Sequence, residues 1–449
     1  MRHLLTSLHL HQLSMERRMP LIPFANGRRA CLNAVLGSLL LTGLAAPLMA
    51  ADIPTASPAS KGFSAERLAR IRPVIQAEID AKNMPGAVVV VARKGAIVYS
   101  DAIGVKPDAI FRAYSMTKPM TSVLAMMMVE EGQLQLADPV SKFLPALAQM
   151  QVLANPADPA STTVAAARPI LVHDLLRHTS GLTYAEFTRS AAMRNAYIQA
   201  GLFSNETPSA WITLNPEQQV AAFAKAPLQW QPGSTWEYSL STDLLGRVLE
   251  AVGKKPLGVL LNERLIKPLG MKDTAFVVPA NQVHRIAQPL AIDPLTQKPM
   301  APVLDPTQVQ GNDSGGAGLV TTAADYLRFC QMLLNNGTLD GRRYLSRTTI
   351  ALMTSDHLGP KVATPLQPGE LLMGVQGYTF GLGFMVRQGP GMASVPGSEG
   401  DYAWAGAGGT FFWIDPKEQV IGLLMAQTPG PIRQYYRRMV KQLVYQALE

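Results

Sequence analysis

Residues 111–131 read FRAYSMTKPMTSVLAMMMVEE, and this stretch guides the interpretation of the rest of the chain. Its second half is apolar on nearly all sides and stops at Gly132, which predicts a buried helix. If that helix begins at Ser115, then Ser115 and Lys118 share one face, because residues three apart are neighbours on a helix. Pro119 fits this register, since a missing N–H does no harm within the first helical turn.

A serine and a lysine in this arrangement are suited to acyl transfer. The positive field at a helix N-terminus favours the oxyanion that forms when Ser115 attacks a carbonyl group. Lys118 beside it can serve as a base or activate one. The bare Ser-x-x-Lys pattern is weak, because a chain of this length should contain roughly one by chance. Its position at the head of a buried helix makes Ser115 a candidate nucleophile.

Two further elements lie later in the chain. The first is Tyr238-Ser239-Leu240, where a tyrosine near the lysine could pass the serine proton to a leaving group. The second is Trp404-Ala405-Gly406, in which small residues on an edge strand would let a substrate approach the backbone closely. Taken singly, the tyrosine is more simply a core aromatic residue and the glycine a loop residue. Only in combination do they indicate a catalytic site.

Together these elements resemble the serine β-lactamase/DD-peptidase superfamily, in the order Ser-x-x-Lys, Tyr-x-x and a Gly-containing triplet. The context is similar to its class C β-lactamase-like branch, and most closely to the family VIII bacterial carboxylesterases. The matching stretches are FRAYSMTKP at 111–119, HTSGL at 178–182, GGAGL at 315–319 and WIDP at 413–416. The resemblance runs from about Gly62 to the C-terminus.

This resemblance implies a role for each matched position. Ser115 would be the acylated nucleophile, with Lys118 and Tyr238 as the proton-transfer pair. The backbone N–H groups of Ser115 and Ala407 would form the oxyanion hole. The turn 178–182 is expected to be structural, with the His178 side chain bonded to backbone. The residues expected to bind substrate are Trp404, Ala405, Gly406 and Leu240.

Two departures from the superfamily pattern favour an ester as substrate. Trp404 stands where β-lactamases and DD-peptidases carry a lysine that holds the substrate carboxylate, and Leu240 stands where they carry an asparagine. Both changes remove groups that recognise a peptide-like acid, so a neutral ester with a short or medium acyl chain fits better. The alternatives are a β-lactamase or DD-peptidase, an acyltransferase, and a non-catalytic relative that retains the fold. The intact Ser115, Lys118 and Tyr238 argue against the last.

The hydrophobic pattern predicts an α/β (α+β) fold with one antiparallel sheet built from both ends of the chain. Strands are expected at 86–92, 96–102, 410–414 and 420–427, with a helix over 64–83 before them and an amphipathic helix closing the chain. The resemblance implies the β-lactamase/DD-peptidase-like fold. We expect a discontinuous sheet domain, 51–112 with 313–449, and an inserted, mostly helical domain, 113–312, carrying the nucleophile helix. Segments 155–167 and 362–375 are expected at the cleft mouth.

The charge distribution does not indicate a nucleic-acid partner. Half of the formal net charge of +8 comes from the first fifty residues, and the remainder is spread over a long chain. Arg433, Arg437, Arg438 and Lys441 are expected on the outer, solvated face of the closing helix. The expected partner is a small-molecule ester.

The first fifty residues resemble a leader with a signal peptide. Arg28 and Arg29 precede an apolar run from Ala30 to Leu48, and small residues follow at Ala50 and beyond. The protein is therefore expected to be exported, periplasmic or secreted, with no stable membrane span after the signal is removed. Cleavage at this point would also remove Cys31.

Neither a metal ion nor a cofactor is expected. After export only His173, His178, His284 and His357 would remain, and none of them has the spacing of a metal site except the pair at the turn. Cys330 lies in an apolar helical pattern, which predicts a buried, unreactive thiol. A lipase-type α/β-hydrolase is also excluded, because no Gly-x-Ser-x-Gly pentapeptide occurs.

Overall fold

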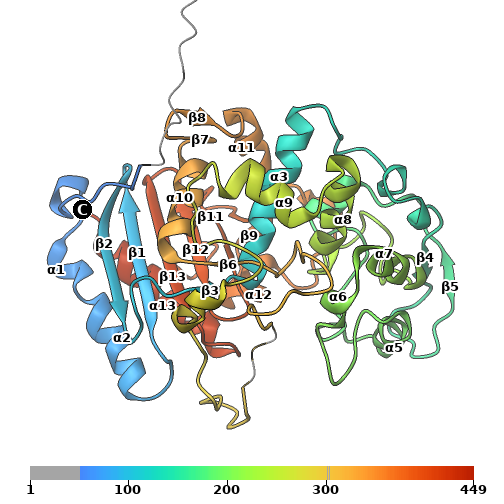
Figure 1. Ribbon diagram of the computed structural model, residues 1–449, viewed down its shortest axis with the longest axis horizontal. Helices are drawn as coiled ribbons and strands as arrows, with labels where there is room; N and C mark the ends of the chain where they lie inside the picture. The colour runs from blue at the N-terminus through green and yellow to red at the C-terminus, as the bar shows by residue number, and fades with distance from the viewer. Residues whose placement is uncertain (1–50, 301, 303) are drawn as a thin grey trace, which may run out of the picture. The chain divides into compact units, whose positions relative to one another are not determined.

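A seven-stranded antiparallel sheet is built from both ends of the chain, which confirms the predicted architecture (Figure 1). The computed structural model describes residues 51–449 apart from 301 and 303, so the predicted leader, 1–50, lies outside the described residues. The strand order is β2-β1-β13-β12-β11-β10-β9. Their bounds are β1 Ala87–Arg93, β2 Ala96–Ile103, β9 Tyr378–Phe380, β10 Met385–Arg387, β11 Tyr402–Ala405, β12 Phe411–Asp415 and β13 Val420–Ala426.

The central pair β1 and β13 joins the N-terminal part of the sheet to the C-terminal part. Their register runs from Ala87 opposite Ala426 to Arg93 opposite Val420. Every residue of both strands is buried, so both faces of the sheet are covered, which explains the unbroken apolar runs in the sequence. β1 turns into β2 through Lys94 and Gly95, both with positive φ (49° and 75°), as a two-residue hairpin turn requires.

Helices cover the two faces of the sheet. α10 (Ala323–Leu334) packs against β1, β12 and β13, while α2 (Ile71–Asp80) and α13 (Ile432–Tyr445) pack together with the sheet at its other face (Figure 1). The helix predicted over 64–83 is divided into α1 (Ala65–Leu68) and α2. The reason is Pro73, which is tolerated only near the start of a helix.

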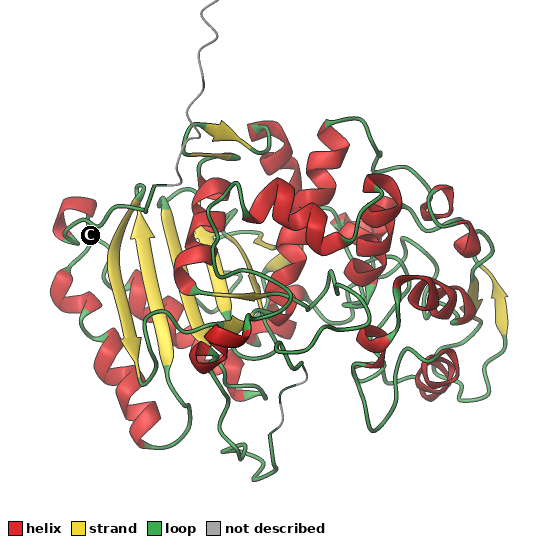
Figure 2. Ribbon diagram, viewed as in Figure 1, coloured by secondary structure: helices red, strands yellow, loops and turns green. Residues whose placement is uncertain are grey.

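The middle of the chain is mostly helical and lies beyond the β9 edge of the sheet (Figure 2). Within residues 51–449, the chain forms one compact unit, and the predicted domain boundaries stay predictions.

The helices of the middle segment are α3 Thr117–Glu130, α4 Val172–Leu176, α5 Ala191–Ala200, α6 Ala210–Thr213, α7 Pro216–Lys225, α8 Ser241–Gly253 and α9 Leu257–Leu261. Later come α11 Arg347–Met353 and α12 Pro368–Met373. Short strand pairs outside the main sheet are β3 Phe111–Arg112 with β6 Val320–Thr321, β4 Gln151–Leu153 with β5 Thr163–Ala165, and β7 Thr338–Leu339 with β8 Arg342–Arg343.

The nucleophile helix begins slightly later than the sequence pattern predicts. Ser115 lies in a 3₁₀ turn, Tyr114–Met116, that leads directly into α3. Tyr114 adopts φ 45°, an unusual backbone conformation for an aromatic residue. α3 is buried along nearly its whole length and ends where Gly132 takes φ 70°. Ser115 is therefore presented at the head of a helix that the core holds rigidly.

The basic residues of the closing helix contradict one prediction. Arg437 and Lys441, expected on an outer face, are buried, with 1% and 0% of their surface exposed. Lys441 Nζ donates to Asp401 at 2.8 Å, and Arg437 donates to two backbone carbonyls. The helix packs between the sheet and α12, so the acceptors that stabilise these charges come from other parts of the chain.

Two smaller expectations concern a thiol and a membrane span. Cys330 in α10 is fully buried, and burial raises the pKa of its thiol well above the ordinary value. Among residues 51–449, apart from the two not described, no helix is long and apolar enough to cross a membrane.

Candidate active site

Ser115 and Tyr238 are joined by a hydrogen bond between their hydroxyl groups, with 2.5 Å between the two oxygens. Tyr238 lies in the loop just before α8, a long way along the sequence from the helix head that carries Ser115. Lys118 Nζ lies 4.8 Å from the centroid of the Tyr238 ring. The tertiary structure therefore places Ser115, Tyr238 and Lys118 next to one another. Tyr238, rather than Lys118, makes the hydrogen bond to the serine.

Lys118 is almost completely buried and donates two hydrogen bonds. Its Nζ lies 2.9 Å from the hydroxyl oxygen of Tyr184 and 2.9 Å from the carbonyl oxygen of Gly316. Burial, together with Tyr238, raises the pKa of Tyr184 well above its ordinary value, so Tyr184 is a neutral phenol. Asp243, a fully buried residue of α8, accepts a hydrogen bond from the Gly316 N–H at 3.3 Å. Burial raises the pKa of this carboxyl group, and the charge of Lys118 opposes that shift.

The turn 178–182 packs against the Tyr238 side chain. His178 lies with its ring centroid 5.1 Å from that of Tyr238, and its backbone carbonyl accepts from the Glu237 N–H. Its ring Nδ1 lies 3.2 Å from Ser239 Oγ, so the expectation that this side chain bonds backbone was wrong. Burial lowers the pKa of His178 well below its ordinary value, so the imidazole is neutral.

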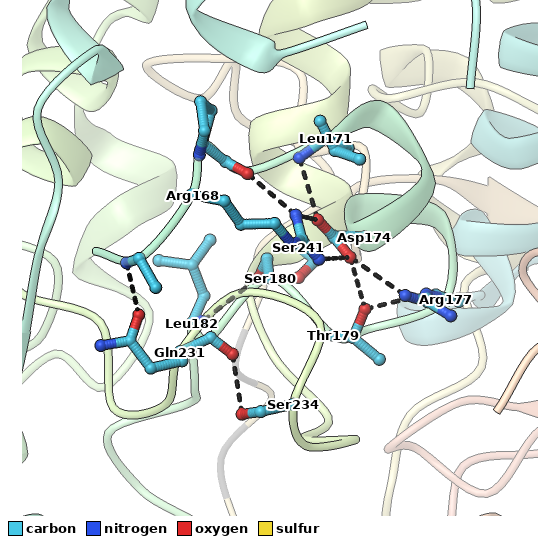
Figure 3. Close-up of polar contacts among 12 residues, drawn as sticks. Arg168, Leu171, Asp174, Arg177, Thr179, Ser180, Leu182, Gln231, Ser234 and Ser241 are labelled. Carbon is cyan, nitrogen blue, oxygen red and sulfur yellow. Dashed lines mark hydrogen bonds and ion pairs between the residues drawn. The ribbon is translucent and has the colours of Figure 1, made fainter. Parts of the chain in front are cut away.

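Asp174 holds this turn in place (Figure 3). Its buried carboxylate accepts two bonds from Arg168, at 2.6 and 2.9 Å, one from Thr179 Oγ1 at 2.8 Å and one from the Leu171 N–H at 3.0 Å. Burial alone would raise the pKa of Asp174, but the bonds from Arg168 and Leu171 hold it below its ordinary value. The ion pair thus anchors the turn that packs against Tyr238.

The backbone N–H groups of Ser115 and Ala407 have no acceptor among the described residues. Both residues line the same cavity. The preceding carbonyl, of Gly406, accepts a 2.6 Å bond from Arg437. A Cβ atom on Gly406 would lie 2.3 Å from the carbonyl oxygen of Ala113. Gly406 is thus required for close approach to the segment before Ser115.

The cavity beside Ser115 measures about 300 Å³. Tyr184 and Tyr238 line it together with three charged residues, Glu186, Arg433 and Arg437. Desolvation by the surrounding protein raises the pKa of Glu186 to about 7, although the residue is exposed at the rim. Most of the remaining wall is apolar: Phe187, Pro208, Trp211, Ala317, Leu371, Leu372, Ala405 and Pro429. Leu371 and Leu372 belong to segment 362–375, whereas segment 155–167 contributes nothing to this wall.

Two residues expected to bind substrate do not line the cavity. Trp404 is fully buried, with ring centroids 5.4 Å from Tyr238 and 5.2 Å from Phe380. Leu240 is buried at the head of α8. The strand that carries Trp404 also lies inside the sheet, between β12 and β10, and is not an edge strand. Trp404 therefore packs behind Tyr238, and the expectation that it contacts substrate is corrected.

Several residues of the site were not found by sequence reasoning. Tyr184 and Glu186 follow the turn 178–182 directly, and that proximity was the available signal. Arg433 and Arg437 were predicted on the solvated face of the closing helix, but both line the cavity. Asp243 is one acidic residue among many in the sequence, and only its bond to Gly316, whose carbonyl accepts from Lys118, distinguishes it.

No group of three or more histidine, cysteine, aspartate or glutamate side chains in the described part of the chain could hold a metal ion. The polar side chains that line the cavity are hydroxyls, two arginines and one carboxylate, and Lys118 lies beside the Tyr238 ring. This arrangement suits nucleophilic catalysis by a serine assisted by proton transfer.

Comparison with known proteins identifies the family. The family model described as Beta-lactamase matches residues 71–444. Protein Rv1367c of Mycobacterium tuberculosis is 36% identical over 365 residues, covering 78% of this chain and 87% of that protein. Esterase EstB of Burkholderia gladioli is 28% identical, covering 81% of this chain and 91% of that protein. The solved structure of EstCE1, a hydrolase with promiscuous acyltransferase activity, matches with a TM-score of 0.67 and 27% identity, covering 85% of this chain and 99% of that one. The chain therefore belongs to the Beta-lactamase family and is a serine hydrolase of the superfamily branch that includes esterases.

Proposed function

We propose that this protein hydrolyses carboxylic esters with short or medium acyl chains through an acyl-enzyme on Ser115. The observation that carries the proposal is the 2.5 Å hydrogen bond between Tyr238 and Ser115, with Lys118 Nζ 4.8 Å from the tyrosine ring and a mostly apolar cavity in front of the serine.

In the proposed reaction, Ser115 Oγ attacks the ester carbonyl carbon while its proton passes to the Tyr238–Lys118 pair. The negative charge that develops on the carbonyl oxygen is stabilised by the N–H groups of Ser115 and Ala407. The C–O bond to the alcohol then breaks, and the alcohol leaves with the proton. Water attacks the acyl-enzyme by the same route, and the carboxylic acid is released.

The cavity wall supports an ester over a peptide-like substrate. Ten of the lining residues are apolar or glycine, and Trp404, in place of the usual lysine, lies buried behind Tyr238. Apolar walls of this kind stabilise an acyl chain by removing it from water. A cavity of about 300 Å³ suits a small ligand.

The test is hydrolysis of p-nitrophenyl butyrate and of a chromogenic cephalosporin by the purified protein and by Ser115→Ala. We expect fast ester cleavage, slow or no lactam cleavage, and loss of both in the variant. Ser100→Ala, which changes an exposed serine of β2, is the matched control and should behave as wild type. Ester cleavage that survives in Ser115→Ala would refute the proposal, and faster lactam cleavage would favour a β-lactamase.

The proton-transfer pair is tested separately. Tyr238→Phe keeps the ring but removes the hydroxyl that bonds Ser115, and Lys118→Ala removes the ammonium group. Each should lower kcat by about 10²–10⁴-fold, the usual contribution of general acid–base catalysis. Trapping with a fluorophosphonate followed by mass spectrometry should locate the label on Ser115. A label elsewhere would contradict the assignment.

We also propose that the protein is exported. The support is the order of positive, apolar and small residues within 1–50. Fractionation of cells that express the full chain should place the mature protein outside the cytoplasm. Replacing Arg28 and Arg29 with glutamate should retain the precursor inside, and an unchanged distribution would contradict export by this segment.

A further inference from the structure

Asp243 is a buried carboxylic acid that the proposed reaction does not yet use. It lies in the first turn of α8 and is 1% exposed. Its Oδ1 accepts hydrogen bonds from the Ser314 hydroxyl and from the Gly316 N–H. Its Oδ2 is also buried and has no hydrogen-bond partner among the described residues. A carboxylate with one unpartnered oxygen in the protein interior is costly unless a cation lies nearby.

Lys118 Nζ and Asp243 Oδ2 face the same small space beside Gly316. A Cβ atom on Gly316 would overlap Asp243 Oδ2 and would lie 3.2 Å from Lys118 Nζ. That space is therefore open because residue 316 has no side chain. Neither Lys118 nor Asp243 is in an ion pair with any other group in the described part of the chain.

Two cations act on the Asp243 carboxyl group, and Lys118 is the stronger of them. Burial raises the pKa of Asp243, and the charge of Lys118 opposes this rise more than that of Arg247 does. Arg247 also has its own partner, Glu250, at 3.1 Å. Lys118, by contrast, donates its hydrogen bonds to uncharged groups. The counter-charge available to this buried lysine is therefore Asp243.

Resting on the proposed function, we propose that Asp243 is a positioning residue that keeps the proton of the Tyr238–Lys118 pair on the lysine. The pair can hold that proton in two ways, as an ammonium group with a phenolate or as a neutral amine with a neutral phenol. A carboxylate beside Nζ stabilises the first arrangement, because opposite charges attract strongly in the protein interior.

Tyr238 is then the base in the reaction, and Lys118 keeps its three protons throughout. As Ser115 Oγ attacks the ester carbonyl carbon, its proton moves to the phenolate oxygen of Tyr238. As the C–O bond breaks, the same proton moves from Tyr238 to the oxygen of the leaving alcohol. The ammonium group stabilises the phenolate before and after each transfer.

A purely structural role for Asp243 predicts a different result. Oδ1 could simply hold the segment around Gly316 in place, with no effect on the proton. Asp243→Asn separates the two roles, because the amide keeps an oxygen for the Ser314 and Gly316 donors but removes the charge. All other charged and titratable groups around the pair remain in this variant: Tyr184, Tyr238, His178, Glu186 and Arg247.

The first measurement is the pH dependence of kcat and kcat/KM for p-nitrophenyl butyrate, corrected for uncatalysed hydrolysis. In Asp243→Asn the alkaline loss of activity should move to lower pH by about one unit or more, and the plateau of kcat should fall by about tenfold or more, as expected for losing an opposite charge at this range. KM should change little, because Asp243 does not line the cavity.

Asp325→Asn is the matched control. Asp325 is another buried carboxyl group, bonded to Thr274 and to the backbone of Lys272 and Asp273 and not to the residues of the site. This variant should leave the pH profile unmoved. A fall in the Asp243→Asn plateau without a shift of the profile would overturn the proposal in favour of the structural role. A raised plateau would overturn it too, since neutral Lys118 would then be the base.

The second measurement needs no substrate. Urea unfolding is followed in wild type, Asp243→Asn, Lys118→Met and the double variant. Lys118→Met leaves a buried carboxylate without its cation, which is strongly destabilising, so the double variant should unfold at a higher urea concentration than Lys118→Met alone. Asp325→Asn combined with Lys118→Met should show additive losses. Additive losses for the Asp243–Lys118 pair would overturn the proposal.

Failure of the proposed function gives a different pattern. The wild type would then cleave no ester, or Ser115→Ala would cleave esters as well as wild type does, while the coupling between Asp243 and Lys118 in the unfolding measurement would remain.

Discussion

The guanidinium group of Arg437 donates a 2.6 Å hydrogen bond from Nη2 to the carbonyl oxygen of Gly406. That carbonyl belongs to the same peptide unit as the N–H of Ala407. In a trans peptide the two groups point in opposite directions, so fixing the carbonyl also fixes the direction of the N–H. A hydrogen bond to the oxygen further polarises the N–H donor. A buried arginine thus orients a backbone group that we assign to the oxyanion hole.

This relationship predicts that Arg437→Met lowers kcat by about tenfold to a hundredfold, less than the 10²–10³-fold loss of a whole oxyanion-hole donor. Binding of a boronic acid that mimics the tetrahedral intermediate should weaken by a similar factor, while KM for p-nitrophenyl butyrate changes little. Arg437→Lys should recover part of the activity because it keeps a donor. Arg438→Met serves as the control, and equal effects in both variants would mean a general disturbance of α13.

The buried position of Trp404 predicts a loss of stability and rate without a change of acyl preference. Trp404→Ala removes a fully buried ring and should lower the free energy of unfolding by about 3–5 kcal/mol. It also removes the support behind Tyr238, so kcat should fall by a similar factor for acetate, butyrate and octanoate esters. Urea denaturation and steady-state kinetics measure the two effects.

Leu371→Ala is the comparison for acyl preference, because Leu371 lines the cavity. It should raise the rate on octanoate relative to butyrate while leaving stability nearly unchanged. If Trp404→Ala instead altered the relative rates as Leu371→Ala does, the indole would have to contact substrate after all.

The Asp174 carboxylate, buried and bound by Arg168, predicts an acid-sensitive contribution to stability. Asp174→Asn should lower the free energy of unfolding by about 1.5–3 kcal/mol near pH 7, because the buried side chain loses its charged hydrogen bonds to Arg168, whose own side chain is 35% exposed. The pKa of Asp174 is depressed in the folded protein, so its stabilisation is complete above the unfolded value of about 3.9 and is lost as the pH falls below it. The difference between wild type and variant should therefore shrink below about pH 4.

Glu263→Gln is the matched control for this prediction. Glu263 forms an ion pair with Lys255 in which both side chains are 49% exposed. Exposed pairs contribute about 1 kcal/mol or less. A loss in Asp174→Asn no larger than in Glu263→Gln would show that the turn 178–182 does not depend on this carboxylate.

The raised pKa of Glu186 predicts a pH-dependent preference between anionic and neutral esters. The groups that act on its titration are Arg194, Lys118 and Tyr184, and Arg433 lies in the same cavity wall. Above about pH 7 Glu186 becomes negative and opposes a substrate carboxylate, which is ionised throughout this range.

The ratio of kcat/KM for anionic to neutral ester should therefore fall roughly two- to fivefold between about pH 6 and pH 8, the effect of about 1 kcal/mol or less from a partly exposed charge. In Glu186→Gln the ratio should be flat across that range. A step of the same size in the variant would assign the titration to another group.

Much of the fold could be predicted from local patterns. The β-branched run of β1, the Lys94–Gly95 turn and the paired strands β12 and β13 each have a local physical cause, namely side-chain packing on a covered sheet and positive φ at the turn. The head of α3 was predictable in the same way, because a nearly all-apolar helix must be buried. The division of the first helix was missed although its cause, Pro73, is visible in the sequence.

For the candidate site, some residues could be found from short motifs, and others depended on tertiary packing. Ser115, Lys118 and Tyr238 were found because each lies in a recognisable short motif. Trp404 was misplaced because a tryptophan next to such a motif has the same sequence whether it faces the cavity or the core. Its position depends on packing against Phe380, which comes from a different strand.

The sequence by itself determined four of the seven strands of the main sheet, the start of the helix after Ser115 to within two residues, and the presence of a serine–lysine–tyrosine set. Only the tertiary structure decided which groups the arginines of α13 contact. A stripe of charge on an amphipathic helix normally faces water, because desolvating a guanidinium group is costly. Here carbonyl groups of Leu372 and Gly406, brought from distant parts of the chain, offset that cost for Arg437. Such acceptors are invisible until the chain is folded.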